Sequence, residues 1–180
     1  MRNIFTKDDW VLESVSDFSV CITFDCGDDD INDYFRKDVC WHKEELICHP
    51  YALYQVTEPD FHLAFLDFCN DSIKLKYLKE TIDPKIHYQD LPAVKLTRIG
   101  VVKDFRNKNV GTQAMNMVKE FFKTDNRTGC RFITVDANQG AIGFYEKNGF
   151  ALLTDKDKNK DSRAMYFDLK RFVLPLESEP

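Results

Sequence analysis

The chain has 180 residues, of which 43% are hydrophobic and 31% are charged, and its formal net charge is −5. This length suits one compact domain over residues 1–180 that builds its core without metal ions or disulfides. No apolar run approaches the ~20 residues of a membrane-spanning helix, and the first ten residues lack the apolar stretch of a secretory signal. We therefore expect a cytoplasmic protein with no membrane partner.

The N-terminal half alternates short apolar stretches with turns. Strands are expected at 20–24, 51–57 and 62–69, and an amphipathic helix at 31–47, with Pro50 marking its end. Because only a short turn separates the strands at 51–57 and 62–69, we expect them to form an antiparallel hairpin. Residues 72–90 stay ambiguous, because helically spaced leucines precede the helix-breaking pair Asp83-Pro84.

The C-terminal half predicts alternating strands and helices. Strands are expected at 93–102, 131–137, 151–154 and 164–169, a helix from 110 to 123, a short helix from a cap at Asn138 to Lys147, and loops at 103–109 and 155–162. Strand–helix–strand order implies right-handed parallel crossovers. Together with the hairpin, this predicts a mixed α/β fold, with a central sheet of six or seven strands and helices on both faces.

Charge is distributed unevenly along the chain. Residues 1–93 contain 9 Lys and Arg against 19 Asp and Glu, whereas residues 94–131 contain 9 against 3. A basic middle in an acidic protein indicates a localised anion site rather than a general nucleic-acid surface.

The cysteines and histidines form no recognisable reactive set. Six cysteines show no C-x-x-C pair, so we expect reduced thiols. Cys40, His42, Cys48 and His49 lie close together, but their spacing matches no common zinc site, so no metal is expected. No histidine pattern suggests a hydrolase triad.

The basic segment contains the loop Arg106-Asn107-Lys108-Asn109-Val110-Gly111-Thr112 between a predicted strand and a predicted helix. A helix N-terminus exposes unpartnered N–H groups that can hold a diphosphate, and Arg106 and Lys108 would add positive charge. Gly111 lets the backbone approach a ligand, and Asn109 tolerates a left-handed conformation. An ordinary solvated loop is the alternative. The absence of a Walker loop and of G-x-G-x-x-G argues against a nucleotide hydrolase or a dinucleotide enzyme.

The loop and its surroundings resemble the GNAT acyltransferase superfamily. Arg106 and Gly111 match the two ends of its motif R/Q-x-x-G-x-G/A, while Asn109 replaces the first glycine. Residues 97–101 (TRIGV) look like the strand that hydrogen-bonds pantetheine, and residues 141–150 (AIGFYEKNGF) are similar to the family's "FYEKxGF" helix. The resemblance is strongest over about residues 91–169.

This resemblance implies an acetyl-CoA-binding sheet that splays between the strands at 93–102 and 131–137. It also implies that Tyr145 protonates the leaving thiolate, which a phenol with a pKa of about 10 can do at neutral pH. A core aromatic residue beside Phe144 is the alternative. The residues implied to bind coenzyme A are Ile99, Gly100, Val101, Arg106, Asn107, Lys108, Asn109, Val110, Gly111, Thr112 and Asn138.

No general base is assigned. Residues 91–102 contain no Glu, and Asp67, Asp90 and Asp136 are candidates that could equally be capping, turn or strand-face carboxylates. Arg98 is either a partly buried ion-pair residue or a cation of the substrate site.

The expected function is transfer of acetyl from acetyl-CoA to a primary amine of a small molecule, peptide or protein, in a ternary complex. Family analogy also suggests a homodimer.

Residues 24–35 also resemble a subgroup that includes toxins that acetylate aminoacyl-tRNA and pair with a small antitoxin. The net charge of −10 over residues 1–93 argues against a tRNA surface. A third alternative is an inactive module that binds coenzyme A or a protein partner, because Asn109 replaces the motif glycine and no base is evident.

Overall fold

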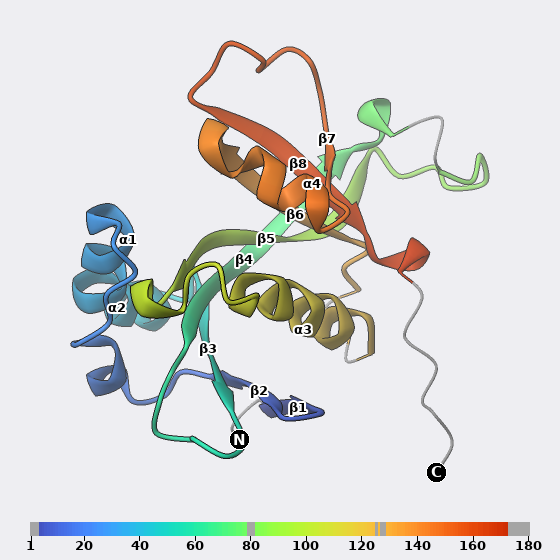
Figure 1. Ribbon diagram of the computed structural model, residues 1–180. Helices are drawn as coiled ribbons and strands as arrows, with labels where there is room; N and C mark the ends of the chain where they lie inside the picture. Colours follow the sequence, from blue (N-terminus) through green and yellow to red (C-terminus); the bar gives the residue numbers. More distant parts are fainter. Residues whose placement is uncertain (1–3, 79–81, 125, 127–128, 173–180) are drawn as a thin grey trace. The chain divides into compact units, whose positions relative to one another are not determined.

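The computed structural model describes residues 4–78, 82–124, 126 and 129–172 (Figure 1). The strands are β1 (Ile4–Lys7), β2 (Trp10–Ser14), β3 (His49–Gln55), β4 (Ala64–Lys74), β5 (Asp90–Val101), β6 (Phe132–Asn138), β7 (Ala151–Leu152) and β8 (Ser162–Asp168). The α-helices are α1 (Asp29–Asp33), α2 (Val39–Glu44), α3 (Val110–Thr124) and α4 (Ile142–Lys147). This combination confirms the predicted mixed α/β class.

The strands form one sheet in the order β1-β2-β3-β4-β5-β6-β8-β7, which gives eight strands in the described residues where six or seven were expected. The chain divides into two compact units, Met1–Asp71 with Val94–Val118 and Ser72–Ala93 with Lys119–Pro180. Because β4 and β5 contribute residues to both units, the single domain over 1–180 stays a prediction. The splay between β5 and β6 also stays a prediction, since the carboxyl half of β5 and β6 belong to different units.

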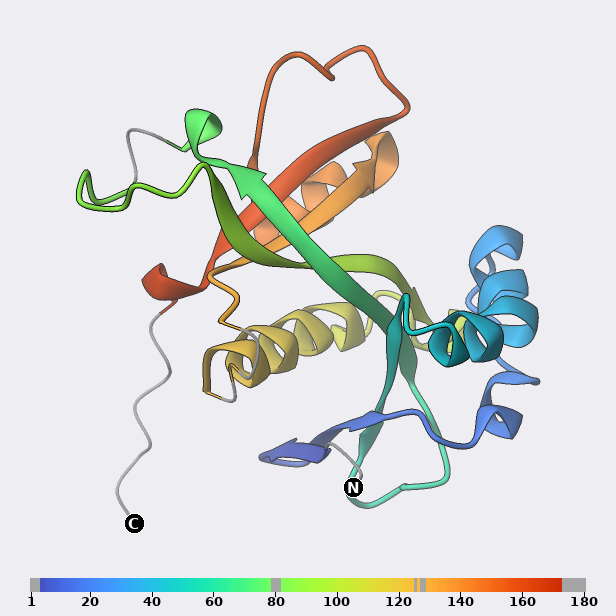
Figure 2. The same ribbon diagram turned by 180° about the vertical axis from the view of Figure 1, so that it is seen from behind.

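The first unit opens with a hairpin that the sequence analysis missed (Figure 2). β1 and β2 pair antiparallel, and between the paired residues Lys7 and Trp10 the two-residue turn places Asp8 at a φ of 50°. β2 then pairs with β3, with Leu12 opposite Leu53, and both side chains are fully buried. These two extra strands enlarge the sheet beyond the expected number.

The strand predicted at 20–24 is wrong. A 3-10 turn, Phe18–Cys21, stands there instead, and the Asp17 side chain accepts a hydrogen bond from the Ser19 N–H at its start. Cys21 and Phe24 are both buried. This three-residue spacing suits a turn that packs one side against the core, whereas a strand would alternate every second residue.

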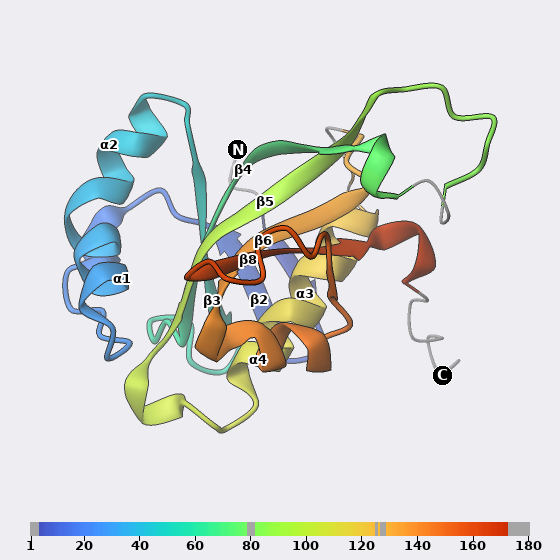
Figure 3. The same cartoon turned by 90° about the horizontal axis from the view of Figure 1, so that it is seen from above.

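The helix predicted at 31–47 is confirmed as one helical segment that changes type along its length. α1 is followed by a π-helical turn, Tyr34–Asp38, and by α2. The Asp28 carboxylate caps α1 by accepting a hydrogen bond from the Ile31 N–H at 3.2 Å. The segment ends where Leu46 takes a φ of 61°, while Pro50 lies inside β3. Figure 3 shows α2 beside β3.

The predicted hairpin is confirmed by the antiparallel pair β3–β4, in which Ala52 lies opposite Phe65 and Leu53 opposite Ala64. Adjacent residues of a strand face opposite sides of the sheet, and both Ala52 and Leu53 are buried. Both faces of this strand pair are therefore covered, as expected for a sheet between helices. β4 continues to Lys74, so the ambiguous segment 72–90 begins as a strand.

The core of the first unit forms around Phe24, Phe35 and Phe65, whose ring centroids lie 4.9–5.6 Å apart. β5 joins this core at Gly100, where an added Cβ would lie 2.7 Å from the Phe24 Cζ and 3.0 Å from the Ile31 Cγ2. Protein interiors are too densely packed to absorb such an overlap. Glycine is therefore required here by the close approach of β5 to the helical segment.

The second unit is built on the antiparallel pair β6–β8, to which β7 adds at the edge. Its core contains Ile73, Leu78, Leu91 and Phe132. α4 packs against β6 (Figure 1). These elements confirm the predicted strands near 131–137, 151–154 and 164–169.

The two ends of α4 differ in how well they were predicted. The C-terminal end is confirmed, because Gly149 has a φ of 79° and the Phe150 N–H donates to the Tyr145 carbonyl. The cap at Asn138 is wrong: this side chain makes no capping hydrogen bond, and a 3-10 turn, Gln139–Ala141, precedes α4. Hydrogen bonds from Gln139 to the loop before β8 hold the chain there before the helix begins.

Within the described part of the chain, no helix is both long enough and apolar enough to cross a membrane. All six cysteines are described, and they form no disulfide.

Candidate functional site

The loop before α3 contains two asparagines in the left-handed conformation. After a 3-10 turn, Lys103–Phe105, Asn107 has a φ of 62° and Asn109 a φ of 65°. Asparagine is one of the few residues besides glycine that adopt this conformation readily. Asn109 thus supplies the positive φ that a glycine at this motif position would allow. The departure from the motif gives no reason to expect a distorted loop.

Four consecutive backbone N–H groups, at residues 109–112, open α3. None of them donates a hydrogen bond within the described residues, whereas the Asn109 carbonyl accepts one from the Gln113 N–H at 3.0 Å. α3 has 15 residues, and these N–H groups stand at the positive end of its dipole. The loop therefore presents donors that no protein group uses, in the arrangement that binds anions at helix N-termini.

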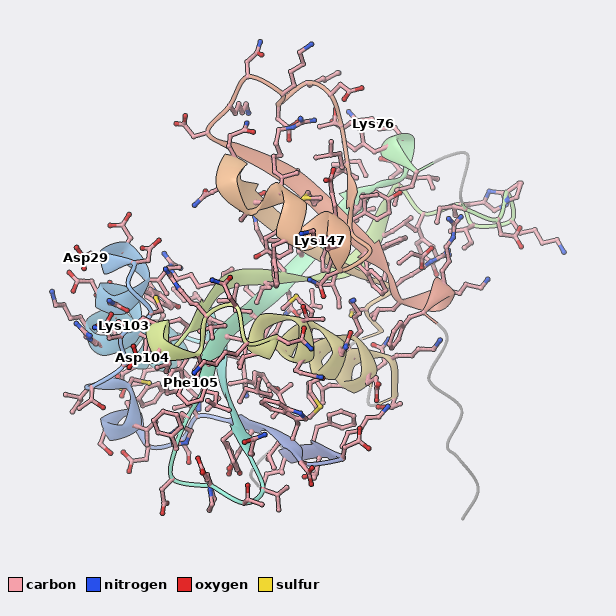
Figure 4. All side chains as sticks on the ribbon, in the orientation of Figure 1. Asp29, Lys76, Lys103, Asp104, Phe105 and Lys147 are labelled. Atoms are coloured by element: carbon pink, nitrogen blue, oxygen red, sulfur yellow. The ribbon has the colours of Figure 1, made fainter. Side chains whose placement is uncertain are left out.

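The loop is anchored to the segment that precedes α1. Lys103 Nζ forms an ion pair with Asp25 Oδ2 at 2.7 Å, and the Lys103 N–H donates to the Asp25 carbonyl at 3.0 Å. Asp25 Oδ1 accepts from the Gly27 N–H and the Asn32 amide. These hydrogen bonds, that from Lys103 first, lower the pKa of the Asp25 carboxyl below its ordinary value. Figure 4 labels Lys103 on this turn and Asp29 on α1.

Arg106 and Lys108 are exposed cations of the loop, as is Lys103, which pairs with Asp25. The Arg106 guanidinium lies against Gly27, since an added Cβ there would be 3.5 Å from Nη1. Lys108 Nζ lies 4.8 Å from the centroid of the Phe105 ring. Neither cation has an ion-pair partner among the residues that the structure describes. Both charges are therefore available to an anion beside the N–H groups of α3.

The carboxyl end of β5 belongs to the same unit as the loop. Ile99 and Val101 are half-buried, and Gly100 is buried against Phe24. Close packing thus accounts for the glycine without a ligand, and the role of residues 99–101 as partners of pantetheine stays a prediction.

Tyr145 lies in the second unit, as does Asn138, which is exposed at the end of β6. The Tyr145 side chain is 5% exposed, and its ring centroid lies 5.2 Å from that of Phe144 and 5.5 Å from that of Phe150. Burial raises the pKa of Tyr145 to about 12, so the phenol stays protonated at neutral pH. No hydrogen bond joins its hydroxyl to any other described residue. A core role therefore explains the ring, and the hydroxyl is not among the buried polar atoms that lack a partner in the described residues.

A buried polar cluster in the first unit was not predicted. Asp67 on β4 is 1% exposed, and its Oδ2 accepts hydrogen bonds from the Tyr34 hydroxyl at 2.7 Å and the Thr97 hydroxyl at 2.8 Å. The Arg98 guanidinium lies 3.7 Å from the Tyr34 ring centroid. Arg98 is exposed and has no ion pair within the described residues, so the ion-pair alternative for it is wrong. The available sequence signal was a lone carboxylate inside the apolar run 64–69.

The other two candidate bases have different surroundings. Asp90 Oδ1 pairs with Lys74 Nζ at 2.7 Å, and Asp136 is exposed on β6. Among the described residues, no group of three or more His, Cys, Asp or Glu side chains could hold a metal ion.

Comparisons with known proteins agree with the loop geometry. Residues 78–150 match the sequence profile of the Acetyltransferase (GNAT) family. No curated protein is significantly similar in sequence to the chain.

Several solved structures share the fold over nearly the whole chain. AtaT complexed with acetyl-methionyl-tRNAfMet superimposes with a TM-score of 0.68 at 22% identity, covering 90% of this chain and 96% of AtaT. AtaTR bound with acetyl-CoA gives 0.64 at 22% identity, with 91% and 96% covered. A tyrosine-to-phenylalanine mutant of KacT gives 0.66 at 21% identity, with 91% and 96% covered. The profile match and the shared fold confirm the predicted resemblance to the GNAT superfamily.

Proposed function

We propose that this chain, whose residues 78–150 match the GNAT acetyltransferases, transfers an acetyl group from acetyl-CoA to a primary amine. The observation that carries the proposal is the start of α3. The four N–H groups of residues 109–112, which start at the left-handed Asn109, have no partner within the described residues. Arg106 and Lys108 lie in the same loop and have no ion pair there. This is a suitable donor set for the diphosphate of coenzyme A.

Different residues serve different steps. The N–H groups of 109–112 and the two cations hold the diphosphate, and Asn107 and Asn138 add coenzyme contacts. Backbone groups of residues 99–101 bind the pantetheine arm and polarise the thioester carbonyl. The amine, as its free base, attacks this carbonyl; an amide bond forms, the carbon–sulfur bond breaks, and the nitrogen gives up one proton to water, from which the phenol of Tyr145 is later reprotonated. Tyr145 donates a proton to the departing thiolate, which suits a phenol kept protonated by burial.

Calorimetric titration with acetyl-CoA tests the diphosphate assignment. We expect Arg106→Glu to weaken binding by about 1–2 kcal/mol, because a charge-assisted contact is lost. Lys37→Glu is the matched control, since it reverses an exposed charge that pairs with Asp33. Equal affinities of wild type and Arg106→Glu would remove Arg106 from the diphosphate site. A thiol-release assay over polyamines, amino acids, peptides and charged tRNA then identifies the acceptor.

Aminoacyl-tRNA is the second candidate acceptor, under which a small antitoxin would be a partner. It is favoured because the structural likeness to AtaT covers 90% of this chain, and that structure contains acetyl-methionyl-tRNAfMet. The acidic balance of residues 1–93 opposes it, because tRNA phosphates need a basic surface. This candidate predicts growth arrest on induced expression in bacteria, with acetylated aminoacyl-tRNA in the extract. Normal growth with unmodified tRNA would exclude aminoacyl-tRNA and leave small-molecule, peptide and protein amines as the candidate acceptors. The homodimer stays a prediction.

A further inference from the structure

In the described residues, one oxygen of the Asp67 carboxylate has no hydrogen bond, although the Cys48 thiol lies beside this carboxylate. Both hydroxyl donors, Tyr34 and Thr97, bind Oδ2, while Oδ1 is buried and has no hydrogen-bond partner within the described residues. A buried polar atom without a partner is costly, and native proteins keep few of them. Such an atom in a fully buried carboxylate therefore calls for a partner that the chain does not supply.

The Asp67 carboxylate also lacks an ion pair within the described residues, although the His49 ring lies near enough to interact with it electrostatically. No Lys, Arg or His lies within ion-pair distance of it among the described residues. Arg98, on β5 next to Thr97, stacks on the Tyr34 ring instead. Burial, with Cys48 and Asp67 nearby, raises the pKa of Tyr34, so its hydroxyl stays a neutral donor. A buried ionised carboxylate is tolerated when a cation pairs with it.

The position of this carboxylate suits the acceptor of the reaction. β4 and β5 are neighbours in the sheet, and Thr97, which bonds Asp67, is two residues before Ile99. Residues 99–101 are those proposed to hold the pantetheine arm. The missing partner must bring both positive charge and N–H donors. A metal ion would need further ligands, and the described residues offer no such group.

We propose that Asp67 Oδ1 binds the acceptor's amino group as its primary ammonium ion, which gives one proton to water before the free amine attacks the thioester. Tyr34 and Thr97 hold Oδ2, and so aim Oδ1 at this ligand. The inference rests on the proposed amine acetyltransferase and makes Asp67 the residue that determines its acceptor specificity. A cationic primary amine is accepted. An alcohol is rejected because it carries no charge, and a quaternary ammonium is rejected because it has no N–H donor.

Binding is tested with methylammonium chloride as the probe and tetramethylammonium chloride at equal concentration as the ionic-strength control. Methylammonium should raise the Tm of the wild type more than tetramethylammonium does, because only it can donate to Oδ1. The difference should vanish in Asp67→Asn and persist in Asp33→Asn, whose exposed carboxylate already pairs with Lys37. Equal effects of the two salts on the wild type, or a difference that survives in Asp67→Asn, would overturn the proposal.

Kinetics separate this inference from the proposed function. With spermidine or methionine amide as acceptor, Asp67→Asn should raise the amine KM about tenfold or more while leaving the acetyl-CoA affinity within about twofold. An unchanged amine KM would refute the role of Asp67 and leave the acetyltransferase intact. If the wild type releases no thiol with any amine, the proposed function fails, and the salt comparison still decides the binding of ammonium.

If Asp67→Asn does not fold, a crystal of the wild type soaked in methylammonium chloride tests the proposal instead. It should show the nitrogen about 3 Å from Oδ1. Oδ1 without a bound nitrogen in that crystal would refute the proposal.

Discussion

Asn109→Val tests whether the left-handed backbone is needed at the proposed coenzyme site in the loop before α3. Asn109 has a φ of 65°, a region that costs most L-residues about 1–2 kcal/mol and is especially poor for β-branched side chains. Valine can keep this φ, in which case the free energy of unfolding falls by about that amount. Alternatively the loop relaxes to negative φ, and acetyl-CoA binding weakens instead. The two losses together should reach about 1–2 kcal/mol, a factor of about 5–30 if all of it falls on binding.

Calorimetric titration with acetyl-CoA and thermal unfolding measure the two losses separately. Asn109→Gly is the matched control, because glycine adopts positive φ without steric cost and should bind acetyl-CoA as the wild type does. An Asn109→Val protein that unfolds and binds like the wild type would refute the reasoning from backbone geometry. A loss shared by Asn109→Val and Asn109→Gly would instead assign the effect to the asparagine side chain.

Three further outcomes are expected. Tyr145→Phe should lower kcat in the thiol-release assay while leaving acetyl-CoA affinity within about twofold, because it removes only the proposed proton donor; unaltered kcat would exclude the tyrosine from the mechanism. Gly100→Ala should lower the free energy of unfolding by about 1–3 kcal/mol, since its Cβ would lie 2.7 Å from Phe24; wild-type thermal stability would contradict this packing. The pKa of Asp157 is lowered, mainly by the Ala164 N–H and also by Arg163, so its stabilisation is complete above about pH 4 and is lost as the pH falls through the folded pKa. Asp157→Asn should remove this part of the acid dependence of Tm, and an unchanged pH profile would contradict it.

The elements of the second half were predictable because their signals are local. The apolar face of α3 recurs at helical spacing, and the run that becomes β6 is continuous. Asn148-Gly149-Phe150 carries its own helix stop, which needs only a left-handed residue and an apolar contact.

The errors of the first half arose where tertiary contacts decide the conformation. Residues 20–24 contain β-favouring side chains, but burial of Cys21 and Phe24 on one side holds a turn. β1 and β2 were missed because strands of four and five residues show too short a pattern of their own; pairing of β1 with β2, and of β2 with β3, stabilises them. Asn138 was expected to cap a helix that starts later, after its neighbour Gln139 bonds the loop before β8.

The sequence by itself determined the chemistry of the loop at 106–112, because a strand, two cations, small or left-handed-tolerant residues and a helix start are consecutive in the chain. Only the tertiary structure decided that the donors of α3 have no described partner, since a hydrogen bond from any distant segment could have used them. Asp67 depends on tertiary structure even more. Its hydroxyl donors come from residues 34 and 97, and its lack of an ion pair within the described residues is visible only when the neighbours of the buried carboxylate are known. Local conformation follows from adjacent residues, whereas burial and pairing depend on segments far apart in the chain.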